Sequence, residues 1–181
     1  KRQTGFLTPD LGNSQSTGSS VSTPYFYVIS DDKDITVKPQ LFDNSAFLLQ
    51  NEFRQKTKKS LSVIDFGFVK GHDSNKNDKG DTRTHIFTNS IVDLSLDNFL
   101  NSMLNISYQK TNNDNYLKIF NLRSPILPVN NTVLESIIEL DLEHEDYDLT
   151  TSFEMYETLK GSKNDRYQYV LPSYNFSKNF Y

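Results

Sequence analysis

Apolar and polar side chains alternate along most of this chain, and this period of two constrains its fold more than any other feature. Successive side chains of a β-strand point to opposite faces of a sheet, so such alternation is typical of strands with one apolar and one polar face. In segment 133–144, leucine and isoleucine side chains alternate with Glu135, Glu139, Asp141 and Glu143. The same pattern predicts strands over 34–42, 46–56, 97–109 and 147–157.

The composition also favours an all-β fold. Alanine, the best helix former, occurs only once in the 181 residues, at Ala46. The 10 tyrosines and 13 phenylalanines raise the aromatic content to 13%, and aromatic side chains suit a pleated, half-buried surface. We therefore predict about ten antiparallel strands in an up-and-down order. Turns are predicted at 30–32, 43–45, 112–115 and 161–165, a long polar loop at 72–81 and an irregular connection at 121–131.

Charge and composition exclude several classes of function. The formal net charge is -4, and no basic stripe is present, so we expect no nucleic-acid partner. No stretch approaches the roughly 20 consecutive apolar residues of a membrane-spanning helix. The absence of cysteine excludes disulfides and thiolate metal sites.

Alternation alone leaves two architectures open. Ten residues at about 3.3 Å each, tilted near 40°, span the roughly 25 Å apolar band of an outer-membrane barrel. A soluble β-sandwich that binds carbohydrate would alternate in the same way, with its apolar faces packed against each other. The two differ in whether one face stays exposed or is buried under a second sheet. That face is predicted to hold Ile35, Val37, Leu41, Phe47, Leu49 and Phe53.

An ordered set of short motifs occupies residues 2–54. These are Arg2 with Gly5-Phe6-Leu7-Thr8-Pro9, then Pro24-Tyr25-Phe26-Tyr27, Asp34-Ile35-Thr36-Val37-Lys38-Pro39 and Glu52-Phe53-Arg54. In order and spacing the set resembles the start of the membrane barrel of the LPS-assembly protein family (LptD, also called organic solvent tolerance protein, OstA). Residues 171–174, Leu-Pro-Ser-Tyr, are similar to a later segment of that family.

The resemblance implies an all-β antiparallel meander that is part of a large transmembrane β-barrel in the outer membrane of a Gram-negative cell. Residues 1–181 would be the N-terminal portion of the barrel, without the family's periplasmic jellyroll and closing strands. The implied function is transport of lipopolysaccharide (LPS) and its insertion into the outer leaflet, with no enzymatic activity and no cofactor. The implied partners are LPS, the LptE lipoprotein plug, the periplasmic LptA bridge and outer-membrane lipid.

Two prolines are the candidate gate residues. Pro9 and Pro24 fall inside the first two predicted strands, 5–13 and 19–28, and proline cannot donate to a strand ladder. They fit ordinary edge positions. The resemblance implies a further role, because in that family the first strand meets the last at a seam through which LPS leaves sideways. We therefore expect few regular ladder bonds around both prolines.

The densest charge feature is the acidic stripe Glu135, Glu139, Asp141 and Glu143. Carboxylates that share a face repel one another, so they need water, a cation or a basic partner. We interpret the stripe as a solvated barrel lumen or an exposed sheet face. A docking face for a basic partner, a surface screened by Mg²⁺ or Ca²⁺, and a glycosidase carboxylate pair are the alternatives.

No catalytic, cofactor-binding or metal site is predicted. Segment 73–78 partly imitates a calcium loop, but Asp78 occupies the position that requires glycine. The three histidines lack the spacing of a zinc site, and no nucleophile elbow or phosphate-binding loop is present. By alternation, Gln50, Glu52 and Arg54 are expected to share a face with the acidic stripe.

Overall fold

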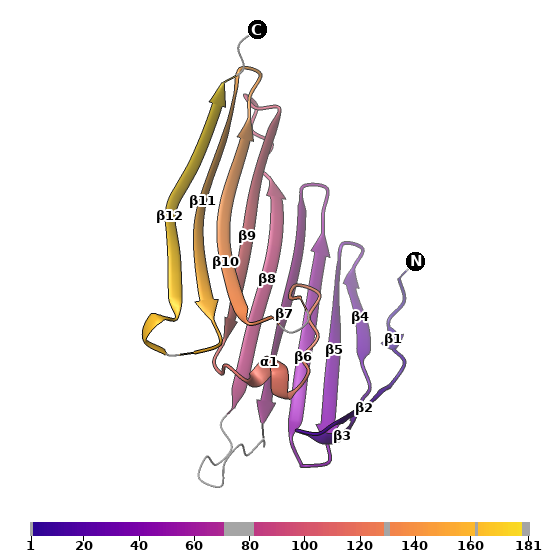
Figure 1. The fold of residues 1–181 in the computed structure, drawn as a ribbon. Coiled ribbons are helices and arrows are strands. Elements are labelled where there is room, and N and C mark those ends of the chain that lie inside the picture. The colour runs from indigo at the N-terminus through magenta and orange to yellow at the C-terminus, as the bar shows by residue number, and fades with distance from the viewer. Residues whose placement is uncertain (1, 71–81, 129–130, 162, 179–181) are drawn as a thin grey trace.

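A computed structural model of the protein describes residues 2–70, 82–128, 131–161 and 163–178, which form a single antiparallel sheet (Figure 1). The strands are β1 (Gly5–Phe6), β2 (Asp10–Ser14), β3 (Gly18–Ser22), β4 (Tyr25–Ser30), β5 (Lys33–Phe42), β6 (Phe47–Lys56), β7 (Ser60–Lys70), β8 (Arg83–Asp93), β9 (Asn101–Thr111), β10 (Val133–Glu143), β11 (Tyr147–Thr158) and β12 (Tyr167–Lys178). A short helix, α1 (Tyr116–Ile119), and a 3-10 turn, η1 (Lys163–Asp165), lie between strands.

The strand order confirms the predicted all-β antiparallel meander. From β4 onward, each strand pairs with the next one in the sequence. In the described part of the chain β1 and β12 stand at opposite ends of this order, so the sheet is open. None of the described helices is long and apolar enough to cross a membrane. The predicted polar loop at 72–81 lies entirely outside the described residues.

The first two predicted strands are each broken at a proline. The first becomes β1 and β2 on either side of residues 7–9, and the second becomes β3 and β4 on either side of residues 23–24. Proline has no N–H to contribute to a ladder, which explains the breaks. The 12 strands therefore trace ten passes of the chain, the number that the alternation predicts.

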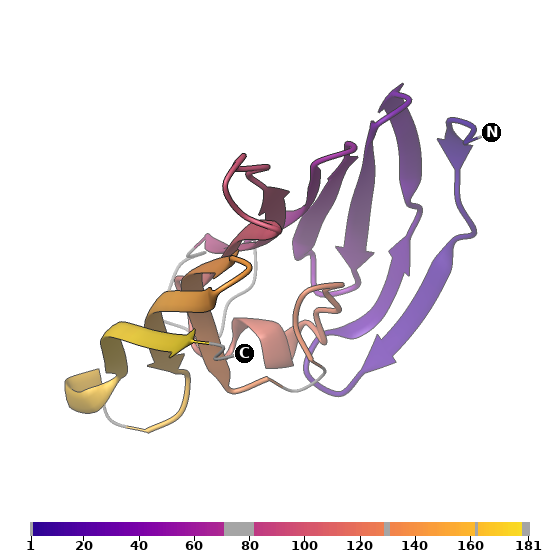
Figure 2. The same ribbon diagram turned by 90° about the horizontal axis from the view of Figure 1, so that it is seen from above.

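The sheet is curved, and α1 and the residues that follow it lie inside the curve (Figure 2). We name this side the concave face and the other the convex face. Gln50 donates to the carbonyl of Arg123 at 2.8 Å, and His85 lies 3.0 Å from the hydroxyl of Tyr116, so both side chains belong to the concave face. The strand registers place Glu52, Asp65 and Phe87 there too.

Two small apolar clusters hold the connection after β9 against the sheet. The first contains Phe42, Ala46, Leu48, Val69, Tyr116 and Phe120, and the second contains Phe87, Leu134 and Leu159. Both draw side chains from the sheet and from the connection, with Leu117 and Leu122 packed against each of them. The covered side of the sheet is thus the side that the sequence marks as largely polar.

The convex face is apolar and has no second layer among the described residues. None of the six side chains that the sequence assigns to it is buried, and Leu41 is 57% exposed. Farther along the sheet, Ile138 is 52% exposed and Phe153 49% exposed. A single residue step along β10, from Ile138 to Glu139, therefore passes from an open apolar face to the polar concave face.

Gly67 permits the close approach of β6 and β8 to β7, and this yields a prediction. A Cβ at Gly67 would overlap the carbonyl oxygen of Leu49 and come within 2.8 Å of Cε1 of His85. Gly67→Ala should therefore lower the free energy of unfolding by about 1–3 kcal/mol, as overpacking does. Urea unfolding of the folded protein measures this. Gly5→Ala is the control, because its Cβ meets no atom within 4 Å; equal stability of the two variants would contradict the prediction.

Candidate functional site

Pro24 removes a backbone hydrogen bond from the N-terminal edge of the sheet, residues 2–30. The N–H of Leu7 donates to the carbonyl of Pro24 at 2.8 Å. Residues paired in this way in an antiparallel ladder normally exchange two hydrogen bonds. The return bond cannot form, because proline has no N–H.

Pro9 lies in an irregularity of the same pairing. Phe6 pairs with Tyr25, and Asp10 pairs with Ser22, so the three residues 7–9 face only two on the neighbouring strand. One extra residue on one strand defines a β-bulge, which interrupts the ladder locally and is a position that tolerates proline. The structure thus brings the two prolines to one interrupted stretch of the edge.

Side chains fasten this edge where the ladder is weak. Asp34, only 2% exposed, pairs with the guanidinium of Arg2 and with Nε of Arg54, the latter at 2.8 Å. Arg54 also lies 3.4 Å from a carboxylate oxygen of Glu52. Residues from three separate sequence motifs therefore meet in one ion-pair cluster. The motifs are visible in the sequence, but this contact could not be predicted from it, because the contact depends on the pairing of β5 with β6.

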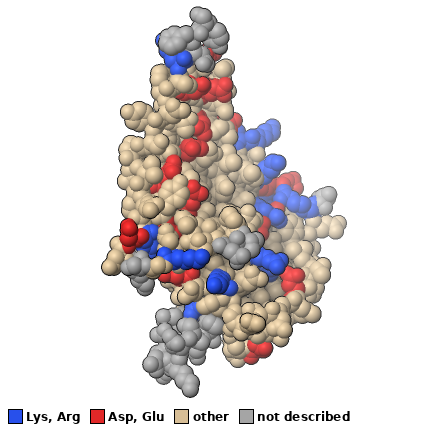
Figure 3. All heavy atoms as spheres, viewed as in Figure 1, with Lys and Arg blue, Asp and Glu red and all other residues tan. Residues whose placement is uncertain are grey.

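The acidic stripe lies on the other half of the sheet, away from the prolines. All four carboxylates are on β10, separated by four, two and two residues, and the registers place Glu139 and Asp141 on the concave face with Gln50 and Glu52. Figure 3 shows acidic side chains in a column over this part of the molecule. The amide of Asn105 donates to Glu139 at 3.1 Å and to Asp141 at 3.4 Å. Among the described residues, these two carboxylates therefore share an amide as hydrogen-bond donor.

A buried polar network at the centre of the concave face was not predicted. Nε2 of His85 lies 3.2 Å from Oδ1 of Asp65, and Nδ1 of His85 lies 3.0 Å from the Tyr116 hydroxyl. Gln50 donates to both oxygens of Asp65, at 3.1 and 3.0 Å, and to the carbonyl of Arg123. In the neutral imidazole, Nε2–H donates to the carboxylate and Nδ1 accepts from the tyrosine. One carboxylate thus orients both groups that fasten the connection to the sheet.

This network is buried. Asp65 and Tyr116 are 0% exposed, and its hydrogen bonds attach the connection after β9 to the sheet. In the described residues, no group of three or more histidine, aspartate or glutamate side chains is placed to hold a metal ion. The signal available in the sequence was Asp65 itself, a lone carboxylate inside the otherwise uncharged run 60–69.

The two faces of the sheet define a class of protein: an all-β antiparallel meander in which, among the described residues, the apolar face is uncovered and the polar face is covered, as in the wall of a β-barrel. Comparison with curated proteins makes the relationship specific. LPS-assembly protein LptD of Ectopseudomonas mendocina is 40% identical over 64 residues, which are 35% of this chain and 7% of that protein. The LptD proteins of Nitrosomonas europaea (41% over 54 residues; 30% and 8%) and Nitrosococcus oceani (30% over 109 residues; 53% and 14%) also match.

The chain is therefore related to LptD, which confirms the predicted resemblance. The matched part spans only 7% to 14% of the length of these three relatives. No family model matches the chain.

The buried tyrosine yields a prediction about pH. Burial raises the pKa of Tyr116 above its ordinary value of 10.0, and the charge of Asp65 raises it further. Above pH 10 the unfolded chain loses this proton while the folded chain keeps it, so stability falls as pH rises. Relative to Tyr116→Phe, the unmodified protein should lose at most about 1.4 kcal/mol per pH unit above pH 10. Urea unfolding between pH 9 and 11.5 measures this. The exposed Tyr108, as Tyr108→Phe, is the control; a pH-independent difference for Tyr116→Phe would refute the assignment.

Proposed function

We propose that this chain is the N-terminal part of an outer-membrane β-barrel that transports LPS and inserts it into the outer leaflet. Its strands form part of the barrel wall, and its N-terminal edge forms one side of a lateral gate. The relationship to LptD supports the transport function. The observation that carries the membrane assignment is the uncovered apolar face opposite a polar face that is covered and partly buried.

Strand length supports a membrane-spanning wall. Strands β5 to β12 contain 10 to 12 residues each, and a tilted transmembrane strand needs about 9–11. A soluble β-sandwich is not favoured, because it would bury its apolar face against a second sheet. The described residues place their only covering segment on the polar face.

Aromatic side chains gather at both ends of the C-terminal strands. Near one end, Tyr147 stacks on His144 with ring centroids 4.6 Å apart and contacts Phe176 at 5.6 Å. Near the other end of β12, Tyr167 and Tyr169 stack at 6.3 Å. Outer-membrane barrels carry aromatic girdles at both membrane interfaces, so this distribution supports a lipid-facing convex surface.

The interrupted N-terminal edge supports the gate. In a closed barrel β1 and β2 would carry the contact with a closing strand, and each hydrogen bond missing between them and the next strand weakens their own attachment to the sheet by about 0.5–1.5 kcal/mol. Pro9 and Pro24 are the gate residues in this proposal, and the acidic stripe lines the lumen. LPS, the LptE plug, the LptA bridge and outer-membrane lipid are the proposed partners of the whole protein, which acts in transport rather than catalysis.

Neighbouring residues on β10 test the membrane assignment. Ile138 is the central residue of β10 and points to the convex face. In the full-length protein folded into a bilayer, Ile138→Arg should cost about 2–4 kcal/mol of folding free energy, as a cation at the midplane does. Glu139→Arg, one residue away on the concave face, should cost far less. Similar losses for the two variants would contradict a lipid-facing convex surface.

The prolines test the gate. Replacing Pro9 and Pro24 together by threonine restores two N–H donors, which should tighten the N-terminal edge by about 1–3 kcal/mol and reduce LPS export. Surface LPS and outer-membrane permeability to a bulky antibiotic measure the effect in cells. Pro125→Thr, in the connection after α1, is the control. Unchanged export in the double variant would make Pro9 and Pro24 ordinary edge prolines.

A further inference from the structure

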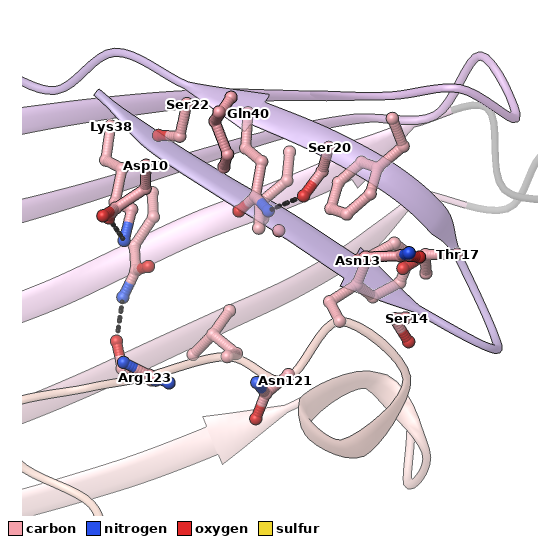
Figure 4. Close-up of a pocket in the computed structure, with 17 residues that line it drawn as sticks. Asp10, Asn13, Ser14, Thr17, Ser20, Ser22, Lys38, Gln40, Asn121 and Arg123 are labelled. Carbon is pink, nitrogen blue, oxygen red and sulfur yellow. Dashed lines mark hydrogen bonds and ion pairs between the residues drawn. The ribbon is translucent and has the colours of Figure 1, made fainter.

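A cavity of about 200 Å³ lies on the concave face beside the N-terminal edge (Figure 4). One wall comes from the β2–β3 hairpin with β5 and β6, and the other from residues 120–123. The hairpin reaches across to α1, where the hydroxyl of Ser16 donates to the carbonyl of Ile119 at 3.0 Å. Two parts of the chain about a hundred residues apart thus enclose the space.

Polar groups converge on this cavity. Ser22 is 2% exposed, and its hydroxyl has no hydrogen-bond partner in the described structure. A buried hydroxyl without a partner is costly, so it marks a place where a polar atom is missing. On the opposite wall, the amide of Asn121 makes no side-chain hydrogen bond with the described residues, and Figure 4 shows it at the cavity. Hydroxyl and amide groups both donate and accept.

Apolar side chains, two of them aromatic, form another part of the lining. Phe42 and Phe120 both line the cavity and meet edge to face, with ring centroids 5.5 Å apart. The charges nearly cancel, since Lys38 lies 3.5 Å from Asp10, and Arg123 leaves one positive charge. The site therefore combines aromatic carbon, neutral hydrogen-bonding groups and almost no net charge.

The geometry points to a binding site for one pyranose ring of a saccharide. A pyranose offers apolar C–H groups to aromatic rings and hydroxyls to serine and amide groups, which is the chemistry of this lining. The volume is below the roughly 300–1,000 Å³ of pockets for larger ligands, so it takes one ring rather than an oligosaccharide. The identity of the biological ligand rests on the proposed function: we expect the saccharide part of LPS to bind at this site, beside the interrupted edge.

Saturation-transfer NMR on the full-length protein tests the site. The protein is held in a detergent without a sugar headgroup and titrated with N-acetyl-D-glucosamine, D-galactose and the acyclic polyol sorbitol. At least one pyranose should receive saturation at its ring protons, and sorbitol should not. Absence of transfer to every pyranose, or equal transfer to sorbitol, overturns the proposal, the first outcome meaning that water alone fills the cavity.

Two variants on opposite walls locate the binding. Ser22→Leu fills the cavity, and Asn121→Gly removes the amide while keeping the left-handed backbone that Asn121 adopts at φ 45°. Each should weaken pyranose binding at least about fivefold, the value of one hydrogen bond. Ser90→Ala, which removes a hydroxyl from the opposite face of the sheet, should leave binding unchanged. Asn121→Gly keeps the test valid if Ser22→Leu does not fold, and unchanged binding in Asn121→Gly overturns the site.

These outcomes are separate from those of the gate experiment. Loss of LPS export in the proline variant with no saccharide binding would leave the transport function standing and remove this site. Saccharide binding together with unchanged export in the proline variant would support this site and contradict the gate role of Pro9 and Pro24.

Discussion

Because side chains alternate with a period of two along the strands, the pairing register that places the apolar side chains on one face also places the polar side chains on the other. A shift of one residue would move every apolar side chain of a strand to the concave face and every carboxylate to the convex one. The ladders from β5–β6 to β10–β11 contain no register shift, so the same assignment holds across the middle of the sheet. The covered face is polar for this reason, and the connection after β9 must attach to it by more than apolar contact.

The hydrogen-bond network around Asp65 attaches the connection after β9 to this polar face. A buried carboxylate is expensive unless it is hydrogen-bonded, and here Gln50 and His85 both donate to it. Each of these side chains then reaches the connection, at Arg123 and Tyr116. The small apolar clusters lie around the network rather than replacing it. The concave face can therefore keep its polar character and still hold a covering segment in one position.

What the sequence could predict follows from how local each signal is. Strands and the faces of their side chains depend on neighbours within a few residues, and the alternation revealed them. The breaks of the first two predicted strands were not predicted as such, although Pro9 and Pro24 marked where ladder bonds would be few. Helix α1 was not predicted, because four residues next to an irregular, proline-containing segment carry no helical period. The contacts of Asp34 with Arg2 and Arg54, and of His85 with Tyr116, depend on register and on the path of a connection without periodicity. No local pattern contains that information.

The N-terminal edge differs from the rest of the sheet in the kind of interaction that holds it. Between β5 and β11 each strand is fixed along its length by a continuous ladder, whereas β1 pairs through two residues only. The remaining attachments of residues 2–7 are individual contacts: Arg2 with Asp34, Thr4 with the N–H of Val28 at 3.0 Å, and Leu7 with Pro24. Breaking a few such contacts frees the first residues without disturbing any ladder beyond β5. An edge built in this way can open locally while the sheet beside it stays folded, which is the property that the proposed lateral gate requires.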